Sequence, residues 1–290
     1  MFQLIMLLRR ALIIFAVIFA WVLPVRGQII SRDDSIARFD ADSLRRAFDS
    51  GPYFSFYKDN YFIVGTSLGY KPTAYNSNVK FQISIQQKLT KSTLPWNTYI
   101  YLFYTQKCFW DVFRNSMPMT DLNFNPGIGI AKPFFSTVTG RYVGKAFLVL
   151  EHESNGRDGE ASRSWNKISF GGNIYVYKNL MVSAKFWIPI VDGGYNRDIL
   201  RYSGIYQMSV DYMTDNRRFG ASLLLVKRKD WTPFNFNTQL DIKFRVFPKD
   251  NQYLFLQYYN GYGEGLLAYK EFHSQIRVGI CLIPTFFGEY

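Results

Sequence analysis

Hydrophobic and polar residues alternate along most of the chain, from about Tyr61 to the C-terminus. Alternation over about ten residues is typical of a β-strand with one apolar and one polar face. Twelve such runs are predicted, at residues 60–70, 78–89, 98–108, 123–133, 142–154, 164–177, 180–190, 201–213, 216–228, 235–247, 252–261 and 272–283. Turn residues such as Lys-Pro-Thr, Tyr-Lys-Asn and Thr-Asp-Asn separate the runs, which predicts consecutive antiparallel strands.

The alternation has the same sign in strand after strand. In residues 236–246 the even positions are Phe236, Thr238, Leu240, Ile242, Phe244 and Val246. The odd positions are Asn237, Gln239, Asp241, Lys243 and Arg245. One face of the predicted sheet is therefore apolar, and the other carries charge.

A soluble β-sandwich also alternates, so the pattern alone leaves two architectures open. Long strands, an even strand number and an exported chain favour a membrane barrel, in which every backbone polar group is paired. Tyrosines near strand ends resemble the aromatic girdles at a membrane interface. They are Tyr99, Tyr101, Tyr202, Tyr212, Tyr253, Tyr258 and Tyr259. We predict an all-β fold, a twelve-stranded antiparallel transmembrane barrel of the bacterial outer membrane, with its apolar face outward.

The first residues look like an export signal. Arg9 and Arg10 precede an apolar stretch at 11–22, and Val25-Arg26-Gly27 offers a cleavage site. Residues 1–27 are predicted to be a signal peptide, and a retained membrane anchor is the alternative. Residues 28–50 are predicted to form a periplasmic segment with a short helix or arm, and residues 51–290 the barrel.

Charge and cysteine content narrow the partners. Loss of residues 1–27 removes three arginines and no acid, so the net charge falls from +12 to +9. Such a basic chain suits an anionic lipid surface. No nucleic-acid partner is expected, because basic residues occur only in scattered groups such as Lys227-Arg228-Lys229. Cys108 and Cys281 lie in distant predicted strands, and we expect them to be unpaired.

The run at 142–154 and the run at 164–177 place polar residues on the apolar side. His152 and Ser154 share even parity with Leu148 and Leu150, and Asn166 has the parity of the lipid-facing residues on the next strand. With the N-terminus in the periplasm, the connection between these two strands is extracellular. The three polar side chains are therefore predicted on the outer wall, near the outer surface of the bilayer.

Polar groups at that position cost free energy and require an explanation. A hydroxyl, an imidazole and a carboxamide can form a nucleophile, its general base and the group that orients the base. Residues two apart on one strand share a face, and a residue on the adjacent strand lies within about 5–8 Å. A strand that merely leaves the hydrocarbon at its rim would also turn polar, so geometry alone leaves both interpretations open.

The longer motif resembles the active-site signature of the outer membrane phospholipase A family. It comprises His152-x-Ser154-Asn155-Gly156-Arg157 followed by Ser162-Arg163-Ser164-Trp165-Asn166. Further segments agree, and the resemblance covers roughly residues 48–282. These segments are Tyr104-Thr105-Gln106-Lys107, Asn123-Phe124-Asn125-Pro126 and Gln257-Tyr258-Tyr259-Asn260-Gly261-Tyr262-Gly263-Glu264.

The resemblance implies a calcium-dependent phospholipase with A1, A2 and lysophospholipase activity that is active as a homodimer on membrane phospholipids. Ser154 would be the nucleophile, His152 the base and Asn166 its orienter. Ca²⁺ would bind the Arg157 carbonyl, the Ser162 hydroxyl and a carbonyl of Ser116 from the second copy. Gln106 aligns with a glutamine that pairs across the dimer.

One position departs from the family pattern. Gly159 stands where the family usually has an aspartate, with Glu160 in place of the proline that follows. This puts the calcium affinity in question. The alternatives are a non-enzymatic channel, a catalytically degenerate family member and a secreted β-sandwich. Lys243, Arg245 and Arg277 are predicted to form charge pairs inside the barrel, and Gly261-Tyr262-Gly263-Glu264 a simple turn.

Overall fold

The computed structural model describes residues 40–190, 194–230, 232–247 and 251–284. The first strands are β1 (Phe54–Phe56), β2 (Asn60–Ser67), β3 (Ser77–Lys88), β4 (Tyr99–Trp110), β5 (Met119–Phe135), β6 (Tyr142–Ser154) and β7 (Ser164–Tyr177). The others are β8 (Leu180–Ile190), β9 (Tyr206–Met213), β10 (Phe219–Lys227), β11 (Phe236–Arg245), β12 (Gln252–Gly261) and β13 (His273–Leu282). The helices are α2 (Ala41–Asp49), α3 (Leu200–Ser203) and the 3₁₀ turns η1 (Pro95–Asn97) and η2 (Gly159–Ala161).

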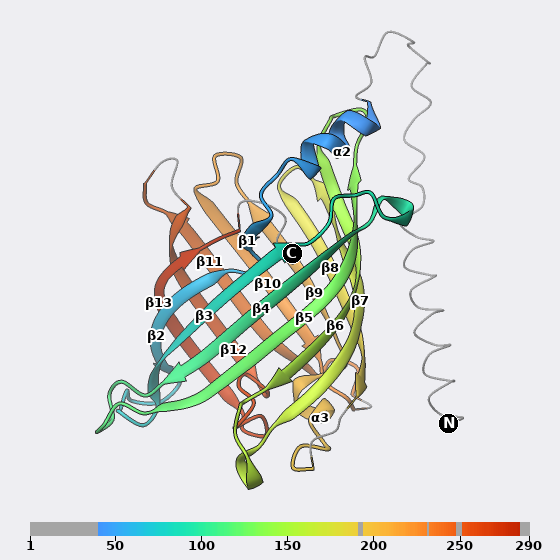
Figure 1. The fold of residues 1–290 in the computed structure, drawn as a ribbon. Helices are drawn as coiled ribbons and strands as arrows, with labels where there is room; N and C mark the ends of the chain where they lie inside the picture. The colour runs from blue at the N-terminus through green and yellow to red at the C-terminus, as the bar shows by residue number, and fades with distance from the viewer. Residues whose placement is uncertain (1–39, 191–193, 231, 248–250, 285–290) are drawn as a thin grey trace.

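Strands β2 to β13 form a closed barrel of twelve antiparallel strands (Figure 1), because β2 pairs with both β3 and β13. The short strand β1 adds a further pairing to β3 beyond the end of β2. Between the β1–β3 and β2–β3 pairings, the Asn60 side chain makes the hydrogen bonds to β3 that a strand backbone would otherwise make. Its amide donates to the Ser84 carbonyl at 3.1 Å and accepts from the Ser84 N–H at 2.7 Å. The predicted fold class is confirmed.

The predicted strands match the observed ones closely, with one clear error. The strand predicted at 201–213 begins only at Tyr206, because Leu200–Ser203 form the helical turn α3. Gly204, with φ +92°, ends that turn and redirects the chain into β9. Strands β4 and β5 extend beyond their predicted outer ends, to Trp110 and back to Met119.

The two faces of the barrel have the predicted chemistry. On β6, Leu148 and Leu150 project outward and are about half exposed, whereas Lys145 and Glu151 are buried inside. Apolar side chains outside and charges inside suit a barrel whose outer wall contacts lipid. The Cys108 and Cys281 thiols are free, as predicted, and both are buried.

Several tyrosines assigned to the aromatic girdles lie instead inside the barrel. Tyr99, Tyr101, Tyr253 and Tyr259 have the parity of the inward-facing positions and are buried. Proximity to a strand end therefore does not decide which face an aromatic takes, since parity overrides it. Tyr212 does face outward and is exposed, as a girdle residue should be.

Buried side chains form clusters at both ends of the barrel interior. Near α2 an aromatic cluster forms around Phe48, Tyr57, Tyr99 and Phe103. The ammonium group of Lys88 fixes the end of α2 by donating to the carbonyls of Phe48, Asp49 and Gly51 at 3.2–3.3 Å. At the other end Trp165, Ile199, Leu266 and Tyr269 form a second cluster. At the α2 end a cavity of about 630 Å³ remains, lined by residues that include Phe48, Asp59 and Lys243.

Charged groups between these clusters pair across the interior. Lys243 forms an ion pair with Asp59, and Arg277 contacts Glu264 at 2.6 Å. Interior charge pairs were predicted for three cations, and Lys243 and Arg277 form them. Arg245 instead lies at the strand end and donates to the Asn216 carbonyl in a turn. Glu264 was assigned to a simple turn and is instead buried between Lys80 and Arg277.

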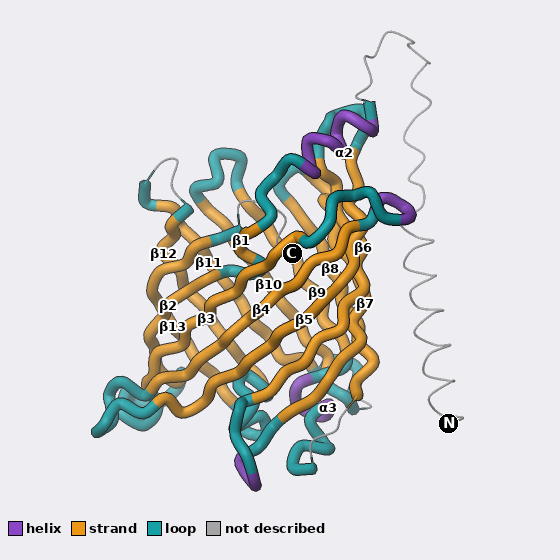
Figure 2. Tube along the Cα trace, viewed as in Figure 1, coloured by secondary structure: helices purple, strands orange, loops and turns teal. Residues whose placement is uncertain are grey.

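Figure 2 shows the loops at the two rims of the barrel. The connections on the α2 side include the short turns β5–β6 and β7–β8, whereas η2 and α3 lie in connections at the opposite rim. The rim that holds η2 and α3 corresponds to the predicted extracellular side. Among the described residues, no helix is both long and apolar enough to cross a membrane. The predicted signal peptide at 1–27 and residues 28–39 lie outside the described residues.

Candidate active site on the outer wall of the barrel

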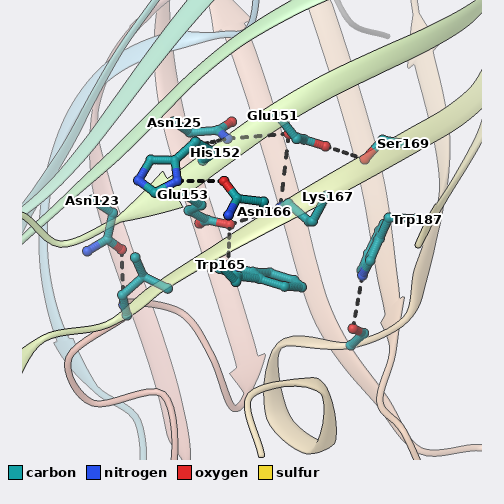
Figure 3. A network of polar contacts seen from close by, with 12 residues as sticks. Asn123, Asn125, Glu151, His152, Glu153, Trp165, Asn166, Lys167, Ser169 and Trp187 are labelled. Carbon is teal, nitrogen blue, oxygen red and sulfur yellow. Dashed lines mark hydrogen bonds and ion pairs between the residues drawn. The ribbon is translucent and has the colours of Figure 1, made fainter. Parts of the chain in front are cut away.

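His152 and Asn166 face each other across the β6–β7 pair. The two residues are direct partners in the antiparallel register, and His152 Nδ1 lies 2.8 Å from Asn166 Oδ1 (Figure 3). An amide oxygen can only accept a hydrogen bond, so Nδ1 carries the proton. In the neutral imidazole with this tautomer, the second ring nitrogen, Nε2, carries no proton and can accept one from another group.

Ser154 lies two residues further along β6, on the same outward face as His152. Its partners in the register are Ser164 on β7 and Phe124 on β5, and Phe124 pairs in turn with Gln106 on β4. The structure therefore brings His152 and Asn166 into contact and places Ser154 beside them. It also puts Gln106 in the same row of the outer wall, two strands away.

The inner face of β6 behind His152 carries a network of charges. Glu151 accepts from Ser169 and lies 3.0 Å from the Lys185 ammonium. Glu153 accepts from Lys167 at 2.9 Å and from the Trp165 indole at 3.1 Å. These residues have the opposite parity to His152, so the network holds β6 from inside while the outer face stays open to lipid (Figure 3).

A groove of about 820 Å³ runs over the outer wall beside His152 and Asn166. It crosses neighbouring strands and is lined largely by apolar side chains. They include Leu102, Tyr104, Pro126, Ile128, Leu150 and Ile190. An apolar groove next to an imidazole suits a ligand with a hydrocarbon part and a reactive polar group.

The β6–β7 loop is organised by the buried side chain of Asn155. Its amide donates to the Ala161 carbonyl at 2.8 Å and accepts from the backbone N–H groups of Arg163, at 2.9 Å, and Arg157, at 3.4 Å. The Arg157 guanidinium extends away to the Thr120 carbonyl at 2.7 Å. The loop is thereby fixed at its start, its end and against the neighbouring strand.

The oxygen atoms assigned to calcium by resemblance lie at this rim. Within the described residues, the Arg157 carbonyl and the Ser162 hydroxyl have no hydrogen-bond partner, and the carboxylates of Asp158 and Glu160 are exposed beside them. Uncharged oxygen donors near carboxylates match the preference of Ca²⁺. Ser116 lies in the adjacent β4–β5 loop, at φ +64°. The described part contains no cluster of three His, Cys, Asp or Glu side chains able to hold a metal.

Beyond the loop, two connections contact each other at the same rim of the barrel. Tyr269 donates to Asp198, and the Lys270 ammonium lies 2.9 Å from the same carboxylate. Burial and the bond to Asp198 raise the pKa of Tyr269 to about 12. Partial burial works against ionisation of Asp198, but the bonds from Tyr269 and Lys270 outweigh it and lower the pKa of that carboxyl.

Sequence reasoning missed the supporting residues of the site. Asn155 appeared only as part of a motif, and neither Asn125 nor Glu151 was assigned a role. Asn125 is buried and donates to the His152 carbonyl at 2.8 Å. A signal was present in the odd parity of Glu151 and Glu153, which places both acids on the inner face directly behind His152.

Comparison with known proteins identifies the family. A family model described as Phospholipase A1 matches residues 53–282. The phospholipase A1 of Escherichia coli K12 is 29% identical over 223 residues, which span 76% of this chain and 74% of the relative. The phospholipase A1 of Proteus vulgaris is 27% identical over the same shares of the two chains.

Solved structures agree with this result. The outer membrane phospholipase A from Escherichia coli superposes with a TM-score of 0.69 at 25% identity, covering 80% of this chain and 99% of that one. The Salmonella typhi outer membrane phospholipase dimer with bound calcium gives a TM-score of 0.69 at 24% identity and covers 82% and 96%. The family model spans well over half of the chain. The chain therefore belongs to the phospholipase A1 family of bacterial outer-membrane enzymes.

Proposed function

We propose that this chain hydrolyses acyl ester bonds of glycerophospholipids, with Ser154 as nucleophile, His152 as general base and Asn166 as the residue that orients the base. The main support for this proposal is the 2.8 Å contact between His152 Nδ1 and Asn166 Oδ1 on a lipid-facing wall. The adjoining apolar groove supports a substrate with acyl chains. A neutral orienter suits this position, because a carboxylate there would have a higher desolvation cost.

The chemistry follows from the protonation state of the imidazole. His152 Nε2 takes the proton of the Ser154 hydroxyl while Oγ attacks the ester carbonyl, and the imidazolium then returns the proton to the departing alcohol oxygen. Water next attacks the acyl-serine, and His152 accepts its proton. The fatty acid is released, and Ser154 recovers its hydroxyl proton from His152. Throughout, Asn166 holds the ring so that Nε2 faces Ser154.

Calcium and a second copy complete the proposal. The Arg157 carbonyl, the Ser162 hydroxyl and the Ser116 carbonyl of the second copy would hold Ca²⁺. When bound there, Ca²⁺ supplies positive charge that stabilises a nearby oxyanion. Two outer walls placed together would enclose the groove and exclude water from it. The homodimer is supported by the dimeric, calcium-bound Salmonella typhi relative.

A direct test uses the mature chain refolded in detergent with a phospholipid substrate. Hydrolysis is expected with calcium and should be lost with chelator. In Ser154→Ala it should fall by at least about a thousandfold, as expected for loss of a nucleophile. Ser164→Ala is the matched control, because it removes a hydroxyl from the register partner of Ser154 and should retain activity. Equal activity in Ser154→Ala and the wild type would disprove the assignment.

The second candidate is a member of the family that has lost its catalytic activity. Gly159 at the rim loop motivates it, because this position supplies no carboxylate for calcium. A folded dimer without hydrolysis at any calcium concentration would support that reading. Activity that appears only at high calcium would instead indicate an enzyme with a weakened calcium site.

A further inference from the structure

The hydrogen-bond ladder between β5 and β6 has a gap beside His152. The register runs from Phe124↔Ser154 to Gly127↔Glu151 without the two intervening pairs, although no residue is inserted on either strand. The missing pairs are Asn125 with Glu153 and Pro126 with His152. Proline has no N–H to donate, so this is the place where the ladder loses a bond.

The side chain of Asn125 fills that gap. Its Nδ2 donates to the His152 carbonyl at 2.8 Å, and the same nitrogen lies 3.3 Å from the Glu151 carboxylate. Asn125 is 8% exposed and faces the barrel interior. A buried amide inside the barrel thus supplies the donor that the main chain of Pro126 lacks.

We propose that Asn125 is a positioning residue for His152, a role that rests on the function proposed above. Asn166 holds the imidazole ring of His152 by a hydrogen bond to Nδ1. Asn125 holds the backbone of His152 by a hydrogen bond to its carbonyl. Through Glu151, which contacts Ser169 and Lys185, the same amide connects His152 to the charged network inside the barrel.

The arrangement also accounts for proline at this position. Pro126 faces outward into the groove beside His152. A proline there offers an apolar ring to an acyl chain. Its missing donor would leave the His152 carbonyl unpaired, at a cost in free energy. Asn125 immediately precedes Pro126 and faces the barrel interior. Its side chain pairs the His152 carbonyl and so avoids this cost.

The test begins with Asn125→Ala and Asn125→Asp in the full-length mature chain, assayed in detergent with calcium. For Asn125→Ala we expect kcat to fall about tenfold, as for the loss of one hydrogen bond, while KM changes less than twofold. Asn125→Asp should fall further, because an acceptor then faces both the carbonyl and Glu151. The rate of Ser154 sulfonylation by a sulfonyl fluoride should fall in parallel, which reports nucleophile activation without lipid binding.

The decisive variant restores the missing donor. In the Asn125→Ala background, Pro126→Ala provides a backbone N–H opposite the His152 carbonyl and should raise kcat at least threefold. In the wild-type background the same change should not raise kcat. Should Asn125→Ala not refold, Asn125→Gln with and without Pro126→Ala makes the same comparison, since the longer side chain displaces the donor.

Asn173→Ala is the matched control. Asn173 is also buried and bonds β6 from the neighbouring strand, by accepting from the Lys145 N–H at 3.1 Å, but it lies far along the strand from His152. It should lower the unfolding temperature as Asn125→Ala does and leave kcat unchanged. Unchanged kcat in Asn125→Ala, or no recovery with Pro126→Ala, would refute the positioning role. Failure of the proposed function itself would appear separately, as activity in Ser154→Ala.

Discussion

The proposed chemistry of this chain depends on a few polar side chains on the outer, lipid-facing wall. His152 and Asn166 form a hydrogen-bonded pair on a wall that exposes many apolar side chains, among them Leu148 and Leu150. Parity along two strands predicted this pair, because the register that follows from alternation brings residues of equal parity together. The same reasoning could not predict Asn125, because its role arises from a missing bond at its neighbour and not from a pattern.

At the scale of the single residue, Asn166→Ala tests whether orientation of the imidazole limits the reaction. Loss of the 2.8 Å contact should lower kcat by about 10- to 100-fold while the fold is retained, because the ring can then rotate away from Ser154. Asn166→Gln keeps the amide and should fall less. The measurement is kcat in detergent with saturating calcium. If the alanine variant is as active as the wild type, Asn166 does not orient the base.

At the scale of the element, strands were predictable and loops were not. The bounds of β6, β7, β8 and β12 follow from alternation and turn residues, with no knowledge of the partners. The β6–β7 loop takes its shape from hydrogen bonds of one buried side chain, Asn155, to atoms up to eight residues away. No periodicity encodes such bonds. The helical turn α3 was missed for the same reason, since four residues are too few to establish a period.

Gly159 offers a test of this loop. The residue has φ +55°, and a Cβ built there meets no atom within 4 Å, so a side chain fits if the backbone tolerates it. Gly159→Asp should lower the calcium concentration for half-maximal activity several-fold, because it adds a carboxylate beside the Arg157 and Ser162 oxygens. Gly159→Asn has the same shape and the same tolerance of positive φ without the charge. Equal calcium titrations for these two variants would argue against a metal site at this loop.

At the scale of the whole molecule, sequence parity predicted the closed barrel and its polar interior but not how the interior groups are distributed. Glu264 illustrates the limit. It follows β12 in a glycine-rich connection that reads as a surface turn, yet the chain folds into the barrel and buries the carboxylate against Lys80 and Arg277. Gly261 permits this inward path, because its φ is +148° and a Cβ would collide with Asn237.

Removal of the Glu264 charge should lower the stability of the barrel and leave its catalytic rate almost unchanged. Glu264→Gln leaves two buried cations without their anion, which costs about 3–5 kcal/mol for a broken buried pair. The unfolding temperature in detergent should fall clearly, whereas kcat per folded chain should stay near the wild-type value. Glu271→Gln, an exposed acid in the same connection, is the control and should not change the unfolding temperature. Similar unfolding temperatures for both variants would contradict the role of the buried pair.

In the proposed dimer the second copy supplies the Ser116 carbonyl and its outer wall. It does not supply the nucleophile. At a dilution where wild-type chains are monomeric and inactive, an excess of Ser154→Ala chains should therefore restore hydrolysis, because they still supply Ser116 and the outer wall. Chains that carry both Ser154→Ala and Gln106→Ala should restore less. Gln106 lies in the row of Ser154, where it accepts from Tyr104 at 3.0 Å and donates to Cys108 at 3.4 Å, and its loss removes a polar contact from the proposed interface. Activity per wild-type chain that is independent of total chain concentration would show that one barrel suffices.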